Sequence, residues 1–432
     1  MNIKEAAKQA QKASIGLSAC RNDLKNSALA EIAKGLINAA SEIEKANEED
    51  LIRSQKENLP APLLKRLNFD RHKIADVVKG IDGLMGLTDP VGETLSTTLL
   101  DDGLELYKVV SPIGVIGVIF ESRPDALVQI STLCLKSGNA VLLKGGNEAR
   151  STNKILTDVI QTASEKAGIP TGWIQFMETR DDVQEMLKLD QSIDLIIPRG
   201  SNEFVRYIME HSNIPVLGHA DGICHCFVDE DVDINMAVNV VVDSKTQYVA
   251  VCNATETLLI HKKTAEKFLP LLKTQLDHKN VEIVGCQRVG EIIDVGMARE
   301  EDWKTEYLDY KLAIKIVDSM EDAINHINQY GSGHTDAILT NIKKNAETFM
   351  NLVDSGNVFW NCSTRFSDGF RYGFGAEVGI STNKIHARGP VGLEGLVIYK
   401  YKMIGHGQIV ADYESGAKQY KHEKINKEFT IE

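Results

Sequence analysis

The sequence has no hydrophobic run long enough to cross a bilayer. Its most apolar stretch, residues 109–120, is interrupted by a serine, a proline and two glycines. It is also far shorter than the roughly 20 apolar residues that a membrane-spanning helix needs. Residues 1–8 contain a glutamate and no apolar core segment, so we expect neither a secretory signal nor a transit peptide there. These features together predict a soluble protein.

Basic residues are outnumbered by acidic ones. The chain has 48 Lys and Arg against 61 Asp and Glu, which gives a formal net charge of -13 and a pI near 5.4. Nonspecific binding to nucleic acid is therefore disfavoured, because no basic face could release enough counterions to offset the repulsion. Any phosphate-bearing ligand must instead meet a local basic pocket.

Cysteine is sparse, and its positions show no disulfide framework. Seven cysteines are scattered over 432 residues, an odd number in a large chain, which indicates reduced thiols in a cytoplasmic compartment. Cys224-His225-Cys226 invites a metal interpretation, but there is no second ligand pair, and in a strand the histidine faces away from the two cysteines. We therefore expect no metal.

The remaining composition is that of an ordinary globular protein, 43% hydrophobic and 25% charged, and 432 residues allow two or three domains. Residues 3–81 show mainly helical periodicity. Two β-prone runs flank Asp101-Asp102-Gly103, which predicts a hairpin because Asp-Gly tolerates the positive φ of a tight turn. Strand and helix patterns then alternate from residue 114 and again after residue 231, as a doubly wound parallel α/β sheet requires.

Glycine-rich bends at strand edges are a first chemical feature. Residues 111–117 and 144–148 each lie at the edge of an expected strand, where open α/β sheets bind ligands. The Gly-x-Gly-x-x-Gly fingerprint of dinucleotide binding is absent from the sequence. The bends are thus compatible with a cofactor site and equally with plain turns.

Cys252 lies in a bend of small residues between a helical pattern and an apolar strand-like run. A thiol placed there can point into a cleft. A thiolate can attack an activated acyl carbon, hold it as a thioester, and allow a hydride to reduce it to an aldehyde. The alternative is that this cysteine is a small buried hydrophobic residue, as most cysteines are.

Six segments of the chain, in order, resemble the gamma-glutamyl phosphate reductases, a family of the aldehyde dehydrogenase superfamily. The resemblance covers nearly the whole chain. The segments are residues 118–126, 197–202, 218–222, 252–257, 331–337 and 385–394.

The resemblance implies a fold, a reaction and an assembly. It implies an NADPH-binding domain (1–93 and 112–247), a catalytic domain (248–394), and an oligomerisation part made of the hairpin (94–111) and a C-terminal strand (395–415). The implied reaction is reduction of L-glutamyl 5-phosphate by NADPH to glutamate 5-semialdehyde and phosphate, the second step of proline biosynthesis. A homodimer or a dimer of dimers is expected, and an association with glutamate 5-kinase is left open.

The resemblance also assigns catalytic residues. Cys252 is the nucleophile, and Arg123 stands where relatives carry an oxyanion-binding asparagine. Arg123 then serves the oxyanion, the departing phosphate or a structural ion pair, and Asn253 is a further candidate that could equally shape the bend. Relatives that oxidise aldehydes have a water-activating glutamate near residue 216, and this chain has none. His219 and Asp221 are acid–base candidates, although such loop residues more often cap turns.

For the cofactor, Lys144 matches a lysine that meets the adenosine ribose, and Asn147 replaces a glutamate that accepts the 2′-hydroxyl in NAD-preferring relatives. A lysine without that carboxylate favours the 2′-phosphate of NADPH. Gly200 and Ser201 resemble the pyrophosphate-side turn, and Glu306 resembles the glutamate that holds the nicotinamide ribose. The alternative for each of these residues is that it lies in an ordinary turn or carries a solvated charge and binds no cofactor.

Two residues near the C-terminus complete the expected site. His386 and Arg388 lie in a loop that could meet the substrate α-carboxylate or the phosphate, or could hold a structural ion pair. The rival functions are another acyl reductase or an aldehyde oxidiser of the same superfamily, and a non-catalytic protein on the same fold. A non-catalytic protein would be expected to lose the thiol and the cofactor turns, which this chain keeps.

Overall fold

The computed structural model describes residues 2–177 and 182–431, and the chain divides into two compact units. The first unit comprises Met1–Gly200, Tyr207–Val216 and Val391–Glu432. The second comprises Ser201–Arg206 and Leu217–Pro390. Helix α9 (Asn202–His211) crosses from the second unit to the first.

The first unit is built on a parallel sheet. Within the described residues it has four strands in the order β5-β4-β3-β6, namely β3 (Val115–Phe120), β4 (Ala140–Gly145), β5 (Ile174–Met177) and β6 (Leu195–Arg199). Every residue of β3 and β4 is buried, as expected for parallel strands covered on both faces. This confirms the β-α-β unit that the sequence predicts after residue 114.

Helices cover this sheet, and local sequence explains where several of them begin. Asn2 and Glu5 form a reciprocal capping box at the start of α1, and the Asp70 carboxylate accepts the backbone N–H of Lys73 at the start of α5. The helical segments of the unit are α1 (Ile3–Leu17), α2 (Asn22–Asn38), α3 (Ala40–Lys56), α4 (Ala61–Leu67), α5 (Arg71–Met85), α6 (Pro124–Lys136), η1 (Asn147–Ala149), α7 (Arg150–Lys166), α8 (Asp182–Met186) and η4 (Leu393–Leu396).

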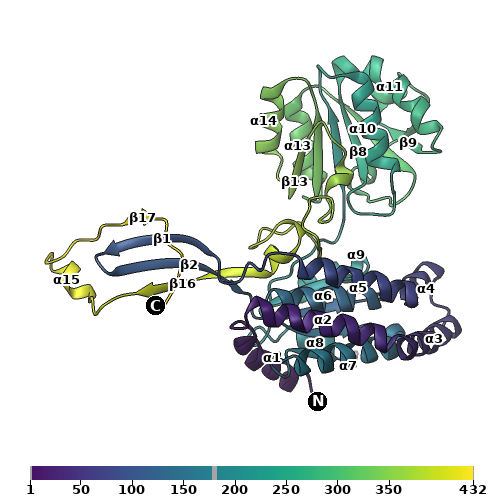
Figure 1. Ribbon diagram of the computed structural model, residues 1–432. Helices are drawn as coiled ribbons and strands as arrows, with labels where there is room; N and C mark the ends of the chain where they lie inside the picture. The colour runs from purple at the N-terminus through teal and green to yellow at the C-terminus, as the bar shows by residue number, and fades with distance from the viewer. Residues whose placement is uncertain (1, 178–181, 432) are drawn as a thin grey trace. The chain divides into compact units, whose positions relative to one another are not determined.

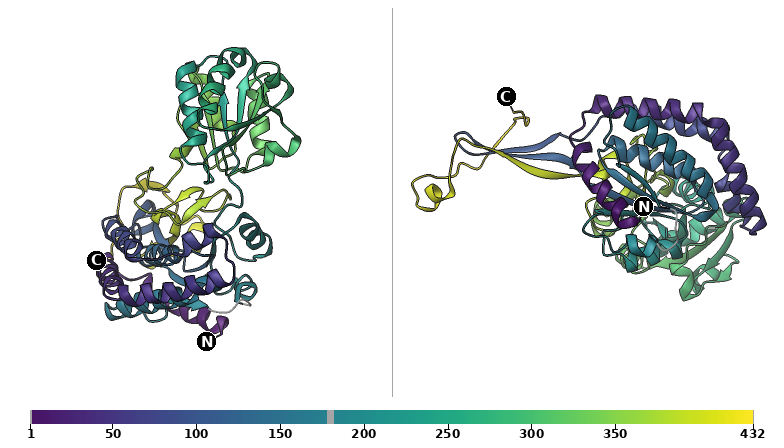
Figure 2. Two further views of the ribbon diagram at one scale, coloured as in Figure 1. Left: turned by 90° about the vertical axis from the view of Figure 1, so that its right-hand side faces the viewer. Right: turned by 90° about the horizontal axis from the view of Figure 1, so that it is seen from below.

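An antiparallel sheet extends from the same unit as an arm (Figures 1 and 2). Gly103, with φ 70°, closes the predicted hairpin of β1 (Thr94–Asp101) and β2 (Leu104–Pro112). Strand β16 (Val397–Ile404) pairs with β2, and β17 (Glu423–Ile425) pairs with β1. Short helix α15 (Val410–Glu414) lies between them in sequence. The C-terminal part of the arm thus runs beyond residue 415, where we expected it to end, because β17 satisfies the outer edge of β1.

The second unit is a three-layer α/β structure (Figure 1). Among the described residues its sheet has seven parallel strands in the order β10-β9-β11-β8-β7-β12-β13. They are β7 (Cys224–Val228), β8 (Thr255–His261), β9 (Glu282–Gly285), β10 (Gly296–Met297), β11 (Lys311–Val317), β12 (Thr335–Leu339) and β13 (Asn357–Trp360).

Alternating side chains of these strands build a hydrophobic core on each face. Leu258 and Ile260 of β8 pack with α10 (Ile234–Thr246) and α11 (Lys262–Asp277), whereas Leu259 packs on the other face with α13 (Met320–Tyr330) and α14 (Lys343–Leu352). The remaining elements are α12 (Gln287–Gly290), η2 (Glu300–Lys304), η3 (Thr364–Phe366), β14 (Gly379–Ser381) and β15 (Gly389–Val391).

The boundary between the units differs from our expectation. We expected the part that carries Cys252 to begin at residue 248, but the second unit takes in the chain from Leu217 because β7 pairs directly with β8 and β12. None of the seven cysteines, all of which lie in the described ranges, forms a disulfide. Among the residues that the structure describes, we find no helix both long and apolar enough to span a membrane.

Candidate functional site

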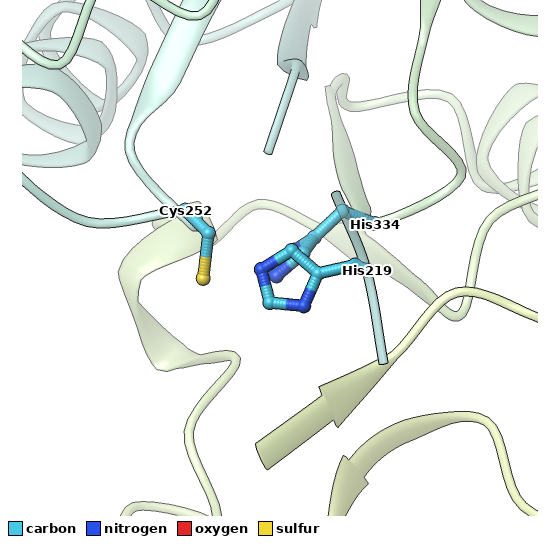
Figure 3. Close-up of side chains that lie close together, drawn as sticks. All are labelled: His219, Cys252 and His334. Atoms are coloured by element: carbon cyan, nitrogen blue, oxygen red, sulfur yellow. The ribbon is translucent and has the colours of Figure 1, made fainter. Parts of the chain in front are cut away.

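Cys252 meets two histidines at the amino edge of the parallel sheet in the second unit. Cys252 precedes β8, His219 precedes β7 and His334 directly precedes β12, and these strands are neighbours in the order β8-β7-β12. One ligand-type atom of each side chain, the cysteine sulfur and an imidazole nitrogen of each histidine, lies within 4.8 Å of the others. Figure 3 shows the sulfur beside the two rings.

Hydrogen bonds and close backbone packing fix the bend that carries Cys252. The Thr364 hydroxyl donates to the carbonyl of Asn253 at 2.7 Å, and the Asn253 amide donates to the carbonyl of Ser367 at 2.7 Å. On another side Gly222 lies against the bend so closely that a Cβ there would overlap the Cα and carbonyl of Cys252. The sulfur is therefore presented from a fixed backbone, and Cys252 itself is half-buried.

The two histidines have defined partners. Nδ1 of His219 donates to the carbonyl of Ile380 at 2.9 Å, so in the neutral ring the lone pair is on Nε2. His334 is fully buried, its Nδ1 lies 2.8 Å from the Thr335 hydroxyl, and its ring meets that of His219 edge-on with centroids 4.9 Å apart. Burial lowers the pKa of His334 well below its ordinary value, so this imidazole is neutral at pH 7.

Charge near the sulfur comes from an arginine that the sequence did not single out. Arg365 of η3 is buried, and burial together with the neighbouring Arg371 lowers the pKa of its guanidinium, while Cys252 opposes this shift from within electrostatic reach. A guanidinium in this position favours the thiolate form of a cysteine. Cys224, the neighbouring cysteine, stays a thiol, because burial raises its pKa well above the usual value. It therefore does not compete with Cys252 as a thiolate.

A buried ion pair underlies the same edge of the sheet. Lys245 of α10 donates to Glu256 of β8 at 2.5 Å, and both side chains are inaccessible to solvent. Burial raises the pKa of Glu256 to about 7 even though Lys245 lowers it, and burial lowers the pKa of Lys245. Glu256 is only four residues after Cys252, so this pair anchors the start of β8 to the helix that precedes the bend.

Glu306 belongs to the same edge of the sheet, just before β11. Asn202 donates to its carboxylate at 2.5 Å, and the backbone N–H of Gly222 is a second donor. Burial raises the pKa of Glu306, while these two hydrogen bonds oppose the shift. Asn202 also donates to Asp221, which pairs with Arg206, so the acid–base candidate Asp221 is engaged in a polar network with the start of α9.

The cofactor candidates of the first unit gather at the carboxyl edge of its sheet. Lys144 ends β4 with Gly145, buried, and its ammonium group donates to the Gly145 carbonyl at 2.5 Å. The Asn147 carbonyl accepts from Arg53, and Gly200 directly follows β6. The carboxyl edge of a parallel sheet is where nucleotides bind in open α/β folds.

Arg123 lies at the same edge, immediately after β3. Its guanidinium is 3.6 Å from the Asp125 carboxylate, and its side chain is 36% exposed. The preceding residue, Ser122, has φ 47° and is held by Glu148, which accepts from both its backbone N–H and its hydroxyl. The Glu148 carboxylate is therefore occupied in shaping the turn that carries Arg123.

The remaining predicted residues separate into different environments. The Ser201 hydroxyl accepts the backbone N–H of Phe204 at 3.4 Å. His386 lies in the same unit as Ser201, and its side chain is exposed. Arg388 binds the Asp354 carboxylate and carbonyl at 2.9 Å each and the Thr382 carbonyl at 3.1 Å. These contacts correspond to the structural alternative that the sequence left open for Arg388.

The structure thus brings together residues that the sequence did not group. His334, Arg365 and Gly222 were not proposed as site residues, although residues 331–337 and 218–222 are among the segments of family resemblance. Cys224, His225 and Cys226 are all buried in β7. Among the described residues, the group of possible metal ligands is His219, Cys252 and His334.

Comparison with known proteins identifies the family of the chain. Residues 1–287 match the aldehyde dehydrogenase family. A protein of Acetivibrio thermocellus named gamma-glutamyl phosphate reductase is 68% identical over 431 residues, covering 100% of both chains, and a protein of the same name from Pelotomaculum thermopropionicum is 65% identical, covering 100% of this chain and 99% of that one. The crystal structure of the Thermotoga maritima gamma-glutamyl phosphate reductase superposes with a TM-score of 0.92 at 41% identity, covering 94% of this chain and 99% of that one.

Replacing Gly222 by alanine tests the close approach to Cys252. The added Cβ has no space against the Cys252 backbone, so we expect Gly222→Ala to displace the bend and change the rate of alkylation of Cys252 by iodoacetamide at least about tenfold, following the sensitivity of reactive groups to small displacements. Gly290→Ala is the matched control, because nothing lies within 4 Å of a Cβ there. An unchanged alkylation rate in Gly222→Ala would contradict this account.

The buried pair Lys245–Glu256 makes a second prediction. Glu256→Gln leaves an uncompensated buried ammonium group and should lower the free energy of unfolding by about 3–5 kcal/mol, measured by urea denaturation. The double variant Lys245→Met/Glu256→Leu removes both charges and should recover most of that loss. If the losses of stability in Lys245→Met and in Glu256→Leu simply added up to the loss in the double variant, the pair would not interact as described.

Proposed function

The chain belongs to the aldehyde dehydrogenase family and, within it, to the gamma-glutamyl phosphate reductases, and on that premise we propose that it reduces L-glutamyl 5-phosphate with NADPH to L-glutamate 5-semialdehyde and phosphate. The relatives compared above are all named as reductases, and the chain is accordingly an oxidoreductase. The proposed reaction is the second step of proline biosynthesis from glutamate.

The observation that carries this proposal is the placement of Cys252. The thiol of Cys252 is half-buried and lies beside two imidazoles. Its backbone is held by Gly222, Asn253 and Thr364. The charge of Arg365 is nearby. These groups lower the free energy of a thiolate and of the negative charge that develops when a thiolate attacks an acyl carbon. Residues 216–222 correspond to the segment that carries the water-activating glutamate in relatives that oxidise aldehydes. Asp221 is the single acidic residue of this segment, and its carboxylate is paired with Arg206.

The residues support a balanced sequence of steps. Nε2 of His219 takes the thiol proton of Cys252, and the thiolate attacks the γ-acyl carbon. The bond between the acyl carbon and the phosphate oxygen breaks, His219 returns the proton to the leaving phosphate, and a thioester remains on Cys252. When bound, NADPH would supply the hydride for reduction of the thioester carbon on Cys252. The resulting thiohemiacetal oxyanion collapses to the aldehyde and restores the thiolate, which regains its proton from solvent.

The backbone at the end of β4 supports the proposed role of Lys144 in cofactor binding. A Cβ at Gly145 would overlap the Asn153 side chain, so the backbone at the end of β4 turns tightly against α7, leaving the Lys144 ammonium at the carboxyl edge of the sheet. Glu148, the acidic group beside Asn147, is bound to Ser122. We propose that Lys144 meets the 2′-phosphate, that Gly200 and Ser201 adjoin the pyrophosphate, and that Glu306 holds the nicotinamide ribose.

The substrate's anionic groups need cationic partners in a chain of negative net charge. We propose that Arg123 binds the oxyanion or the departing phosphate and that Arg365 supplies the positive charge beside Cys252. Asn253 acts through its backbone position in the bend, since its amide is bound to Ser367. His386 remains a candidate for the α-carboxylate, and Arg388 holds the loop that carries His386 by its bonds to Asp354 and Thr382.

We further propose that the arm joins copies of the chain. Strand β16 is an edge strand, and Tyr399, Tyr401 and Met403 on it are 48%, 61% and 56% exposed. Large apolar side chains along an unpaired strand edge favour pairing with a second copy. The absence of disulfides among seven cysteines supports a cytoplasmic location.

Cys252→Ser tests the nucleophile. We expect at least about a thousandfold loss of turnover, because removing a nucleophile eliminates the covalent route. The assay is the reverse reaction, phosphate-dependent reduction of NADP+ by glutamate semialdehyde, with intact-mass detection of the acyl-enzyme. Cys286→Ser, a half-buried cysteine of the same unit, is the control and should keep activity. A Cys252→Ser enzyme with substantial turnover would exclude the thioester mechanism.

Cofactor preference tests the role of Lys144. A charge-assisted hydrogen bond to the 2′-phosphate contributes about 1.5–3 kcal/mol, so kcat/KM should favour NADPH over NADH by about tenfold to a hundredfold. Lys144→Met should remove most of this preference, whereas Lys154→Met, on the exposed face of α7, should leave it unchanged. Equal kcat/KM values for the two cofactors in the unaltered enzyme would contradict the assignment.

A further inference from the structure

The three side chains at the amino edge of the second sheet form a ligand set of a kind that the family's reaction does not require. A cysteine sulfur and two imidazole nitrogens are typical ligands of zinc, and here they come from three neighbouring strands of one sheet. We propose that Cys252, His219 and His334 bind a soft divalent cation, Zn²⁺, and that the bound cation blocks the cysteine reversibly.

The distances are close to those of a zinc site. The three ligand atoms lie within 4.8 Å of one another. A tetrahedral zinc ion with one sulfur and two nitrogen ligands needs these atoms about 3.5 Å apart, from bond lengths of about 2.0–2.3 Å. The largest contraction required is about 1.3 Å, and rotation of the Cys252 side chain about χ1 moves the sulfur without moving its backbone.

The histidines are oriented as metal-binding histidines are. A histidine ligand usually donates its second ring N–H to a backbone carbonyl or another oxygen, which fixes the ring and its tautomer. Nδ1 of His219 donates to the Ile380 carbonyl, and Nδ1 of His334 lies 2.8 Å from the Thr335 hydroxyl, which itself accepts from the Asn357 amide. Nε2 of His334 therefore faces no protein partner, and the tautomer that Ile380 sets in His219 gives Nε2 of that ring the lone pair that a cation needs.

His334 adds an independent observation. Its Nε2 is fully buried and has no hydrogen-bond partner, which is costly for a polar atom in a protein interior. The mechanism proposed above uses His219 and gives His334 no proton to carry. A cation between His334, His219 and Cys252 would satisfy this atom.

The site should exchange its metal. Three protein ligands leave the fourth zinc position open, and the nearby positive charge of Arg365 opposes a cation, so binding should be weaker than in closed structural sites with four ligands. Sharing a lone pair with zinc lowers the nucleophilicity of the sulfur, so zinc-bound Cys252 should react more slowly with an acyl carbon or an alkylating agent. The site would thus both inhibit the enzyme and protect Cys252 from oxidation.

Metal binding to the full-length protein, freed of metal by chelator, tests this directly. Titration with Zn²⁺ by calorimetry should show one site per chain, and Co²⁺ should give a sulfur-to-cobalt charge-transfer band. Cys252→Ser and His334→Gln should each abolish that band and weaken Zn²⁺ binding by more than about tenfold. Cys286→Ser and His278→Gln, which alter a half-buried cysteine and an exposed histidine of the same unit, should change neither readout.

A second variant guards against misfolding of His334→Gln. Thr335→Val keeps the shape of the side chain but removes the hydroxyl that holds His334, and it should weaken Zn²⁺ binding by about tenfold while the protein still alkylates at Cys252 in the absence of metal. Zn²⁺ should slow alkylation of Cys252 by iodoacetamide in the unaltered protein, and chelator should restore the rate.

The proposal is overturned if no stoichiometric Zn²⁺ binding occurs, or if binding persists in Cys252→Ser and His334→Gln. These readouts need no enzyme activity, so they also separate this proposal from the proposed function. A protein that binds Zn²⁺ as described but reduces no acyl phosphate would refute the function alone. Reversible Zn²⁺ inhibition of the reductase is the one expected result that rests on the proposed function.

Discussion

Parallel pairing of β7 between β8 and β12 is the constraint on which the site depends. In a parallel sheet all amino ends meet at one edge, so residues that immediately precede three neighbouring strands must lie close together. His219, Cys252 and His334 are spread between residues 219 and 334 of the sequence, and this edge places one ligand atom of each within 4.8 Å of the others. The hydrophobic layers on both faces of the sheet, around Leu258 and Leu259, hold the strands in that register.

Polar groups buried behind the site show the cost of this arrangement. Glu256 and Lys245 are removed from water together, and the pKa of Glu256 rises to about 7 because the ion pair only partly offsets its loss of hydration. Asn253 and Thr364 close the bend with short hydrogen bonds, and Gly222 allows two backbones to meet. Together these contacts orient the sulfur before any ligand arrives, which is the condition for stabilising charge without reorganisation.

The same sulfur and imidazoles explain why one site can have two properties. Lone pairs that accept a proton or attack carbon are also the lone pairs that bind zinc, so a cysteine nucleophile flanked by two neutral histidines is inherently sensitive to soft metals. His219 has a role in both the proposed reaction and the proposed metal site, whereas His334 is explained by the metal site alone. The separation of these roles follows from their partners, a backbone carbonyl for His219 and a threonine hydroxyl for His334.

The α/β alternation, the Asp-Gly hairpin and the bend at Cys252 could be predicted from the sequence, because turn chemistry and strand periodicity are local properties. The family could be predicted from the resemblance of six segments. The sequence did not reveal that Arg388 is bound to Asp354, that Glu148 holds Ser122, or that His334 and Arg365 lie near Cys252. Nor did it show that the unit carrying Cys252 begins at Leu217 rather than at residue 248. These features depend on which strands pair and which side chains are buried together, and such long-range contacts are decided only when the whole chain has packed.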